Sequence, residues 1–181
     1  MAYLWAPVMV EVSIDSIRVS LMSQHRIVIL KDVDSDRFLP IWIGPYEAEA
    51  ITVSLQQLEV SRPLTHDLLR NVLQELGAEI TQINITELKD DVFFAQIIMT
   101  ANGQEIEIDS RPSDALALSV RAHVPVFVSE DVMQEAASVP EDELESEDLD
   151  EGGEERLEVF KDFVETLDLD DLESSGGNLE E

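Results

Sequence analysis

Two related stretches organise the chain: Ser61-Arg62-Pro63-Leu64-Thr65-His66-Asp67 and, further along, Ser110-Arg111-Pro112-Ser113-Asp114-Ala115. Each is expected to open a helix, because proline is favoured in the first helical turn and the hydroxyl residue after it can serve as the N-cap. The carboxylate that follows complements the positive end of the helix dipole. An arginine is unfavourable at this end, so we expect Arg62 and Arg111 either to pair with nearby acids or to help bind an anion.

The composition fits one domain followed by an acidic tail. The chain has 181 residues and a hydrophobic content of 44%, which is enough for a core. Its net charge of −29 is unevenly distributed: residues 1–133 hold 20 acids against 9 Lys and Arg, a net of −11, and residues 134–181 hold 20 against 2, a net of −18. Neither part resembles a general nucleic-acid binder, so phosphate contact would need a local arginine cluster or a bridging metal ion.

Several classes of protein are excluded by features that the sequence lacks. No cysteine is present, which rules out disulfides and zinc–thiolate sites and fits a reducing cytoplasm. No apolar run approaches the roughly 20 residues of a membrane span, and Met1–Val12 has no basic residues ahead of its apolar ones, so we expect a cytoplasmic protein without a signal peptide. There is no HExxH pair, Walker loop, glycine-rich dinucleotide turn or G-x-S-x-G elbow. The absence of these motifs argues against an ordinary metalloprotease, NTPase, dehydrogenase or hydrolase-fold esterase.

Hydrophobic periodicity predicts an alternation of strands and helices. Strands are expected at residues 9–22, 25–31, 38–43, 78–88, 92–100, 104–109 and 124–128, and helices at 46–59, 64–76, 113–123 and 129–137. The helix at 113–123 is apolar almost all round and should be buried. The helix at 64–76 is expected to bury a stripe of Leu64, Leu68, Leu69, Val72, Leu73 and Leu76, with His66, Asp67 and Arg70 lying off that stripe. Trp42, in an apolar strand, is expected in the core.

An internal repeat predicts the fold class. Pro45-x-Glu47-Ala48-x-Ala50-Ile51 matches Pro112-x-Asp114-Ala115-x-Ala117-Leu118 at a constant offset of 67 residues, from 45 to 112. Three expected strands precede each copy, so the order β-β-β-α occurs twice, with the helix that follows Arg62 inserted between the halves. The prediction is an α+β domain with a mixed or antiparallel sheet, packed helices and duplicated halves.

Composition also divides the chain into segments. The α+β domain is expected to span residues 1–137. Residues 138–153 are rich in Glu, Asp, Ser and Gly and are expected to form a disordered acidic linker. Residues 154–167 place Leu157, Phe160, Val164 and Leu167 on one side of an amphipathic acidic helix, which could dock on its own domain, a sister subunit or a protein partner. Residues 168–181 are expected to be a disordered acidic tail.

Three motifs in register resemble those of the bifunctional nuclease domain family. They are Phe38-Leu39-Pro40-Ile41-Trp42-Ile43-Gly44 with Glu47-Ala48-x-Ala50-Ile51, then Arg62-Pro63-Leu64-Thr65-His66-Asp67-Leu68-Leu69, and Ser110-Arg111-Pro112-Ser113-Asp114-Ala115-Leu116-Ala117-Leu118. The resemblance covers roughly residues 8–137. It implies a compact α+β domain, found in bacteria and plants, with nuclease activity on both RNA and DNA.

The residues of these motifs could support phosphodiester hydrolysis. His66 could act as general base or acid, with Asp67 and Glu47 as further candidates for catalysis. Asp67, Asp114 and Glu47 could hold Mg²⁺ or Mn²⁺. Arg62 and Arg111 could bind the substrate phosphate through paired hydrogen bonds. The first hypothesis is therefore a metal-assisted nuclease, a hydrolase that cleaves RNA and DNA.

Structural roles could account for the same side chains. His66 can be a capping or surface histidine, Glu47 and Asp114 can complement helix dipoles, and the arginines can fasten helices to the sheet. The alternative function is then a non-catalytic binding or regulatory module for a phosphorylated ligand or a protein partner. Catalysis would be favoured if four side chains converge in an open groove: His66, Asp67, Glu47 and Asp114. The binding module would be favoured if these groups are dispersed, or buried in ion pairs that leave no partner free for a substrate. A homodimer is also expected.

Overall fold

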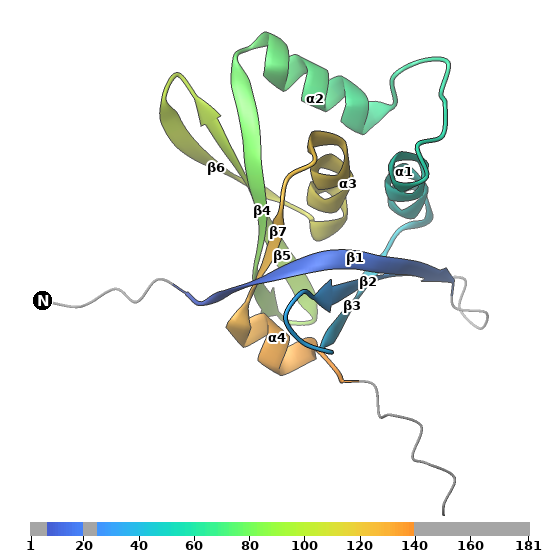
Figure 1. Cartoon of the computed structure of the whole chain (residues 1–181), viewed down its shortest axis with the longest axis vertical. Helices are drawn as coiled ribbons and strands as arrows, with labels where there is room; N and C mark the ends of the chain where they lie inside the picture. Colours follow the sequence, from blue (N-terminus) through green and yellow to red (C-terminus); the bar gives the residue numbers. More distant parts are fainter. Residues whose placement is uncertain (1–6, 20–24, 140–181) are drawn as a thin grey trace, which may run out of the picture. The chain divides into compact units, whose positions relative to one another are not determined.

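The computed structural model describes residues 7–19 and 25–139, which form a sheet with helices packed on it (Figure 1). The strands are β1 (Met9–Val19), β2 (Arg26–Asp32), β3 (Phe38–Ile43), β4 (Ala78–Lys89), β5 (Val92–Ala101), β6 (Gln104–Ser110) and β7 (Val126–Ser129). The helices are α1 (Pro45–Leu55), α2 (Thr65–Glu75), α3 (Pro112–Ala122) and α4 (Glu130–Ala136). Every predicted element within these residues is confirmed, although α1 ends four residues before its predicted end at 59.

The sheet has the order β3-β2-β1-β7-β4-β5-β6, with β7 at its centre. β7 pairs with β4 in parallel and with β1 antiparallel, and the other pairs are antiparallel. The strands β1–β3 and β4–β6 therefore flank β7 as two similar halves. Helices α1 and α3 each follow the third strand of a half and begin at Pro45 and Pro112, as the repeat predicts. The α+β class with a mixed sheet and two β-β-β-α units is confirmed.

The helix α3 forms the centre of the core, and α1 and α2 both contact it (Figure 1). Its residues Ala115–Leu118 are fully buried, which confirms the prediction from its apolar surface. Two alanines in this run let the helix lie close to the sheet, where it packs with apolar side chains such as Ile83 and Val128. Because α1 and α2 both pack on α3, the position of α3 determines how closely the starts of these helices approach each other.

The prediction for the α2 stripe was wrong. Leu68, Leu69, Val72 and Leu76 are 57%, 42%, 44% and 73% exposed, and no residue of α2 is fully buried. Of the other two predicted positions, Leu64 is half-buried and Leu73 packs against the core. The helix turns its polar side toward α3 instead, because Asp67 and Arg70 find partners there. The prediction for Trp42 was also wrong: its side chain is 61% exposed, since its neighbours Ile41 and Ile43 on β3 are the residues that point into the core.

The helix starts differ slightly from expectation as well. The N-caps are Leu64 for α2 and Arg111 for α3, not the hydroxyl residues that follow the prolines. At α2 the carboxylate of Asp67 accepts a hydrogen bond from the Leu64 backbone N–H at 2.8 Å. An acid three residues into the helix thus satisfies one of the amides that a helix start leaves unpaired.

The described part of the chain ends just beyond the domain. Ser138, the first residue of the expected linker, pairs with Phe38 through backbone hydrogen bonds of 2.7 and 2.8 Å. The rest of the expected linker from residue 140, the expected helix at 154–167 and the tail at 168–181 lie outside the described residues. Among the helices of residues 7–19 and 25–139, none is long and apolar enough to cross a membrane.

Candidate functional site

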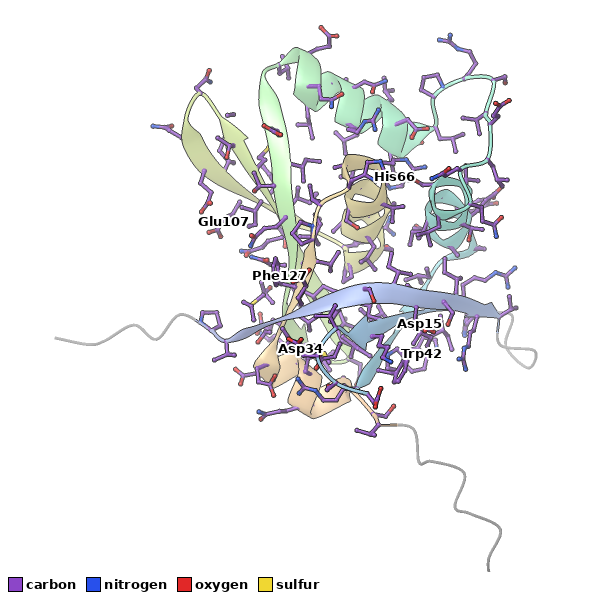
Figure 2. All side chains as sticks on the ribbon, viewed as in Figure 1. Asp15, Asp34, Trp42, His66, Glu107 and Phe127 are labelled. Carbon is purple, nitrogen blue, oxygen red and sulfur yellow. The ribbon has the colours of Figure 1, made fainter. Side chains whose placement is uncertain are left out.

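Four of the six residues singled out in the sequence line one cavity of about 590 Å³. They are Glu47 of α1, His66 of α2, and Arg111 and Asp114 at the start of α3. Figure 2 shows His66 between α2 and α3, where it reaches the start of α3. The remaining lining residues come from the same helix starts and the loop before α2: Tyr46, Glu49, Ala50, Pro63, Leu64 and Thr65.

The polar side chains of this cavity form a continuous chain of contacts. The Arg111 guanidinium forms an ion pair with Glu47, whose Oε1 lies 3.0 Å from Nη2, and it donates a hydrogen bond from Nε to Asp114 Oδ2 at 2.7 Å. The second oxygen of Asp114 lies 3.1 Å from His66 Nε2. Arg111 thus joins α1 to α3, and Asp114 joins α3 to α2. The imidazole is mostly buried, whereas the arginine remains two-thirds exposed at the mouth of the cavity.

Three helix N-termini meet at the cavity. Glu47 and His66 lie in the first turns of α1 and α2, and Arg111 is the N-cap of α3. The amides at a helix start have no partner within the helix, and the helix dipole adds a partial positive charge there. The positive ends of the three helices are suited to binding an anion such as phosphate. They partly offset the negative formal charge of the cavity, where Glu47, Glu49 and Asp114 outnumber Arg111.

The Arg111–Asp114 contact keeps both groups charged. Burial on its own raises the pKa of Asp114, but hydrogen bonds from Arg111 and His66 outweigh it, so this pKa lies below its ordinary value. The hydrogen bond to Asp114, together with the negative charges of Asp114 and Glu47, raises the pKa of Arg111 above its ordinary value. Asp114 therefore faces the imidazole as a carboxylate at neutral pH.

Asp67 and Arg62 do not join this cluster. Asp67 reaches the opposite end of α3 from Asp114, where its Oδ1 accepts a hydrogen bond from Arg121 Nε at 2.6 Å. Arg62 is exposed in the loop before α2, and the residues that line the cavity include its neighbour Pro63 but not Arg62 itself. The convergence expected for the nuclease hypothesis is thus present for His66, Glu47 and Asp114 and absent for Asp67.

The family follows from comparison with known proteins. Residues 28–141 match the model of the bifunctional nuclease domain. The chain belongs to the bifunctional nuclease domain family. An uncharacterized protein of Mycobacterium tuberculosis is 36% identical over 165 residues, which cover 91% of this chain and 99% of that protein.

Plant members of the family are more distant. Bifunctional nuclease 1 of Oryza sativa is 26% identical over 108 residues, and bifunctional nuclease 1 of Arabidopsis thaliana is 25% identical over 109 residues. Both alignments cover 58% of this chain but only 33–34% of the plant proteins. The part aligned with proteins named as nucleases is therefore the domain, and this chain spans about one third of the length of each plant protein.

The sequence reasoning missed Arg121, which holds the three helices together. Its side chain is 3% exposed and lies at the end of α3. It donates to the backbone oxygens of Ala50 in α1 and Ala117 in α3, at 3.0 and 2.8 Å, as well as to Asp67 in α2. One signal was available in the sequence: Arg121 is a charge on a helix that is otherwise apolar almost all round.

The Asp67–Arg121 contact should make stability depend on pH. Burial alone raises the pKa of Asp67, but hydrogen bonds from the Leu64 amide and Arg121 outweigh it, so the pKa lies below the ordinary 3.8. A lowered pKa stabilises the fold at pH values above the ordinary 3.8, and this contribution is lost as the pH falls below 3.8 and through the lowered pKa of the folded state. We expect the difference in unfolding free energy between the wild type and Asp67→Asn to be constant above about pH 5 and to shrink below about pH 4. Urea unfolding at several pH values measures it; a difference that grows on acidification would contradict the account.

Gly44 gives Glu47 the space that it occupies beside Arg111. A side chain at residue 44 would collide with the Glu47 carboxylate. This carboxylate is the end of a flexible side chain, so we expect Gly44→Ala to leave the melting temperature nearly unchanged while moving Glu47 away from Arg111. Any activity of the cavity should then change without loss of folding. A large drop in melting temperature would show that Gly44 serves the fold instead.

The carboxylates of the cavity match only part of a metal site. Among the described residues, no group of three or more His, Asp or Glu side chains has the spacing to hold a metal ion. Glu47 and Asp114 converge on one guanidinium, so they supply two carboxylates at most. Mg²⁺ is commonly held by one or two carboxylates together with water and substrate phosphate oxygens. The pair therefore fits such an ion only when a phosphate completes the set of ligands.

Proposed function

We propose that the chain is a nuclease that hydrolyses phosphodiester bonds of RNA and DNA in the cavity at the starts of α1, α2 and α3. The observation that carries the proposal is the convergence of an imidazole, a guanidinium and two carboxylates where three helix N-termini meet. Membership of the bifunctional nuclease domain family supports the same activity.

His66 would act as the general base. Asp114 is a carboxylate that lies against Nε2, so it favours the tautomer with the proton on Nε2 and leaves Nδ1 as the basic nitrogen. An imidazole exchanges its proton near neutral pH, which suits removal of a proton from water or from a 2′-hydroxyl. Asp114 would then orient the ring and stabilise the imidazolium that forms.

Arg111 would bind the phosphate. Its contacts with Glu47 and Asp114 use Nη2 and Nε, and two thirds of the side chain remains exposed. A guanidinium and nearby helix amides can stabilise the charge that develops on phosphorus during attack. The pairing with Glu47 also fixes the guanidinium in position before substrate arrives.

A divalent ion belongs to the proposal because the cavity carries an excess of acids. Mg²⁺ or Mn²⁺, held by Glu47, Asp114 and substrate oxygens, would neutralise charge and lower the pKa of a bound water. Asp67, also expected as a ligand, is engaged with Arg121 and would contribute only if that contact opened.

One observation favours a second candidate function, a non-catalytic module that binds a phosphorylated ligand. Two half-buried acids, Glu47 and Asp114, are paired with Arg111, so the guanidinium already has partners without substrate. A ligand phosphate could replace one carboxylate without any chemistry following. The two functions share the cavity and differ in whether a bond is broken.

Cleavage of end-labelled single-stranded RNA and DNA by the full-length protein separates them. The assay is run with Mg²⁺, with Mn²⁺ and with EDTA, beside His66→Gln purified identically as a guard against contaminating nuclease. Cleavage that needs metal and disappears in the variant supports the proposal, and cleavage that survives EDTA removes the metal from it. An intact substrate under all conditions, with binding of a phosphorylated nucleotide, supports the second function.

Three further expectations stay predictions. They are a homodimer, a protein partner for residues 154–167 and a cytoplasmic location. Sedimentation equilibrium of the full-length protein measures the first, and capture with a peptide of residues 154–167 tests the second.

A further inference from the structure

Two large aromatic side chains are exposed beside the candidate site. Tyr46, in the first turn of α1, is 82% exposed and lines the cavity that holds His66. Trp42, near the end of β3, is 61% exposed and lines a second cavity. Neither side chain belongs to the hydrophobic core or packs against it, so a role in folding does not explain why a large aromatic residue stands at either position.

Arg111 connects the two cavities because it lines both of them. The second cavity, of about 260 Å³, lies between β3, the β4–β5 turn and the start of α3. Trp42 and Tyr46 are four residues apart, so their Cα atoms are at most about 14 Å from each other. In Figure 2, Trp42 lies by the β1–β3 half of the sheet and His66 lies beside α3.

The domain as a whole has few cations to offer a polyanion. Residues 1–133 contain 9 Lys and Arg against 20 acids. Affinity for a nucleic acid must then come mainly from contacts that do not depend on charge. Stacking of bases on aromatic rings is such a contact, and it needs bases whose faces are free. A duplex keeps its bases stacked inside and presents mostly phosphates, which this domain is poorly equipped to hold.

We propose that Trp42 and Tyr46 are stacking platforms for two bases of a single-stranded nucleic acid, with the phosphate between them at Arg111. The inference rests on the proposed function, because it names the form of substrate that the same cavity takes. The two rings select unpaired strands, and the scissile phosphate is placed beside His66 by the bases on either side of it. Because about one phosphate is contacted by a guanidinium, binding should depend only weakly on salt.

Binding of a fluorescein-labelled oligonucleotide of thymidines to the full-length protein tests this without any need for cleavage. Anisotropy is measured in EDTA, and again in Mg²⁺ with a phosphorothioate strand that resists hydrolysis. Tyr46→Ala and Trp42→Ala are each expected to weaken binding by about 5- to 150-fold, the range for loss of one stacked base. Tyr46→Phe keeps the ring and should bind as the wild type does. Phe94→Ala removes a partly exposed aromatic on β5 that lines neither cavity, and it should also leave binding unchanged.

Two further measurements, tryptophan fluorescence and binding of a duplex, extend the test. In a Trp5→Phe background the remaining tryptophan is Trp42, and its fluorescence should be quenched when the strand binds. A duplex of the same length should bind more weakly than the single strand. The inference is overturned if both alanine variants bind as tightly as the wild type, if the duplex binds equally well, or if no single strand binds under either condition.

The outcomes also separate this inference from the proposed function. Aromatic-dependent binding by a protein that never cleaves would uphold the stacking platforms and reject the nuclease. Cleavage by both alanine variants with an unchanged KM would uphold the nuclease and reject the platforms.

Discussion

Replacing His66 by glutamine is expected to slow cleavage of a labelled single strand by about 10²–10⁴-fold, the usual contribution of a general base. Glutamine can keep a hydrogen bond to Asp114, so the start of α2 should remain in place while the basic nitrogen is lost. The rate is measured under single-turnover conditions with the full-length protein. Asp114→Asn should cause a smaller loss, because it disturbs the orientation of the ring and leaves the base itself.

His25→Gln is the matched control for this variant. His25 is exposed just before β2, and it does not line the candidate cavity, so its replacement should leave the rate within about twofold of the wild type, which corresponds to under half a kcal/mol. Circular dichroism and melting temperature confirm that each variant is folded. A folded His66→Gln protein that cleaves at the wild-type rate would remove His66 from the chemistry.

Arg121→Ala is expected to lower the free energy of unfolding by about 3–5 kcal/mol, the cost of removing one partner from a buried ion pair. The guanidinium satisfies the oxygens of Ala50 and Ala117 and the carboxylate of Asp67, and alanine replaces none of these bonds. Because the contacts reach α1, α2 and α3, the loss should also loosen the cavity. Urea unfolding followed by circular dichroism measures the change.

Two comparisons keep this result interpretable. Arg18→Ala removes an exposed arginine from the end of β1 and should change stability by less than about 0.5 kcal/mol. The double replacement Arg121→Met with Asp67→Leu removes both charges, and it should recover part of the stability lost in Arg121→Ala. A loss below about 1 kcal/mol in Arg121→Ala would show that Arg121 does not fasten the helices.

The sequence was sufficient for the elements and their order, because strands and helices leave different periodicities. The repeat between Pro45 and Pro112 even predicted which helices are equivalent. The orientation of α2 could not be predicted in the same way. Its leucine stripe shows that the helix has two different faces, but which face turns inward depends on partners contributed by α3. The bonds of Asp67 and Arg70 to Arg121 make the polar face the inner one.

The candidate site was predicted in part for a similar reason. An arginine and an acid at a helix start were expected to form a pair, and Arg111 does pair with Asp114 within its own helix start. The contacts of Asp114 with His66 and of Arg111 with Glu47 span 48 and 64 residues of sequence and depend on how three helices approach each other. Asp67 is adjacent to His66 in the chain, but it contacts the far end of α3, where the buried guanidinium of Arg121 holds it.

Nitrogen NMR of the histidine rings tests most directly whether the nucleic acid binds in this cavity. The chain has three histidines, so His25 and His123 serve as internal references for His66 in the same spectrum. Addition of a phosphorothioate single strand to the full-length protein should shift the signals of His66 and leave the other two unchanged. The shift should be absent in Arg111→Ala. A His66 signal that stays unchanged at saturating strand would contradict the account and place the binding site elsewhere on the molecule.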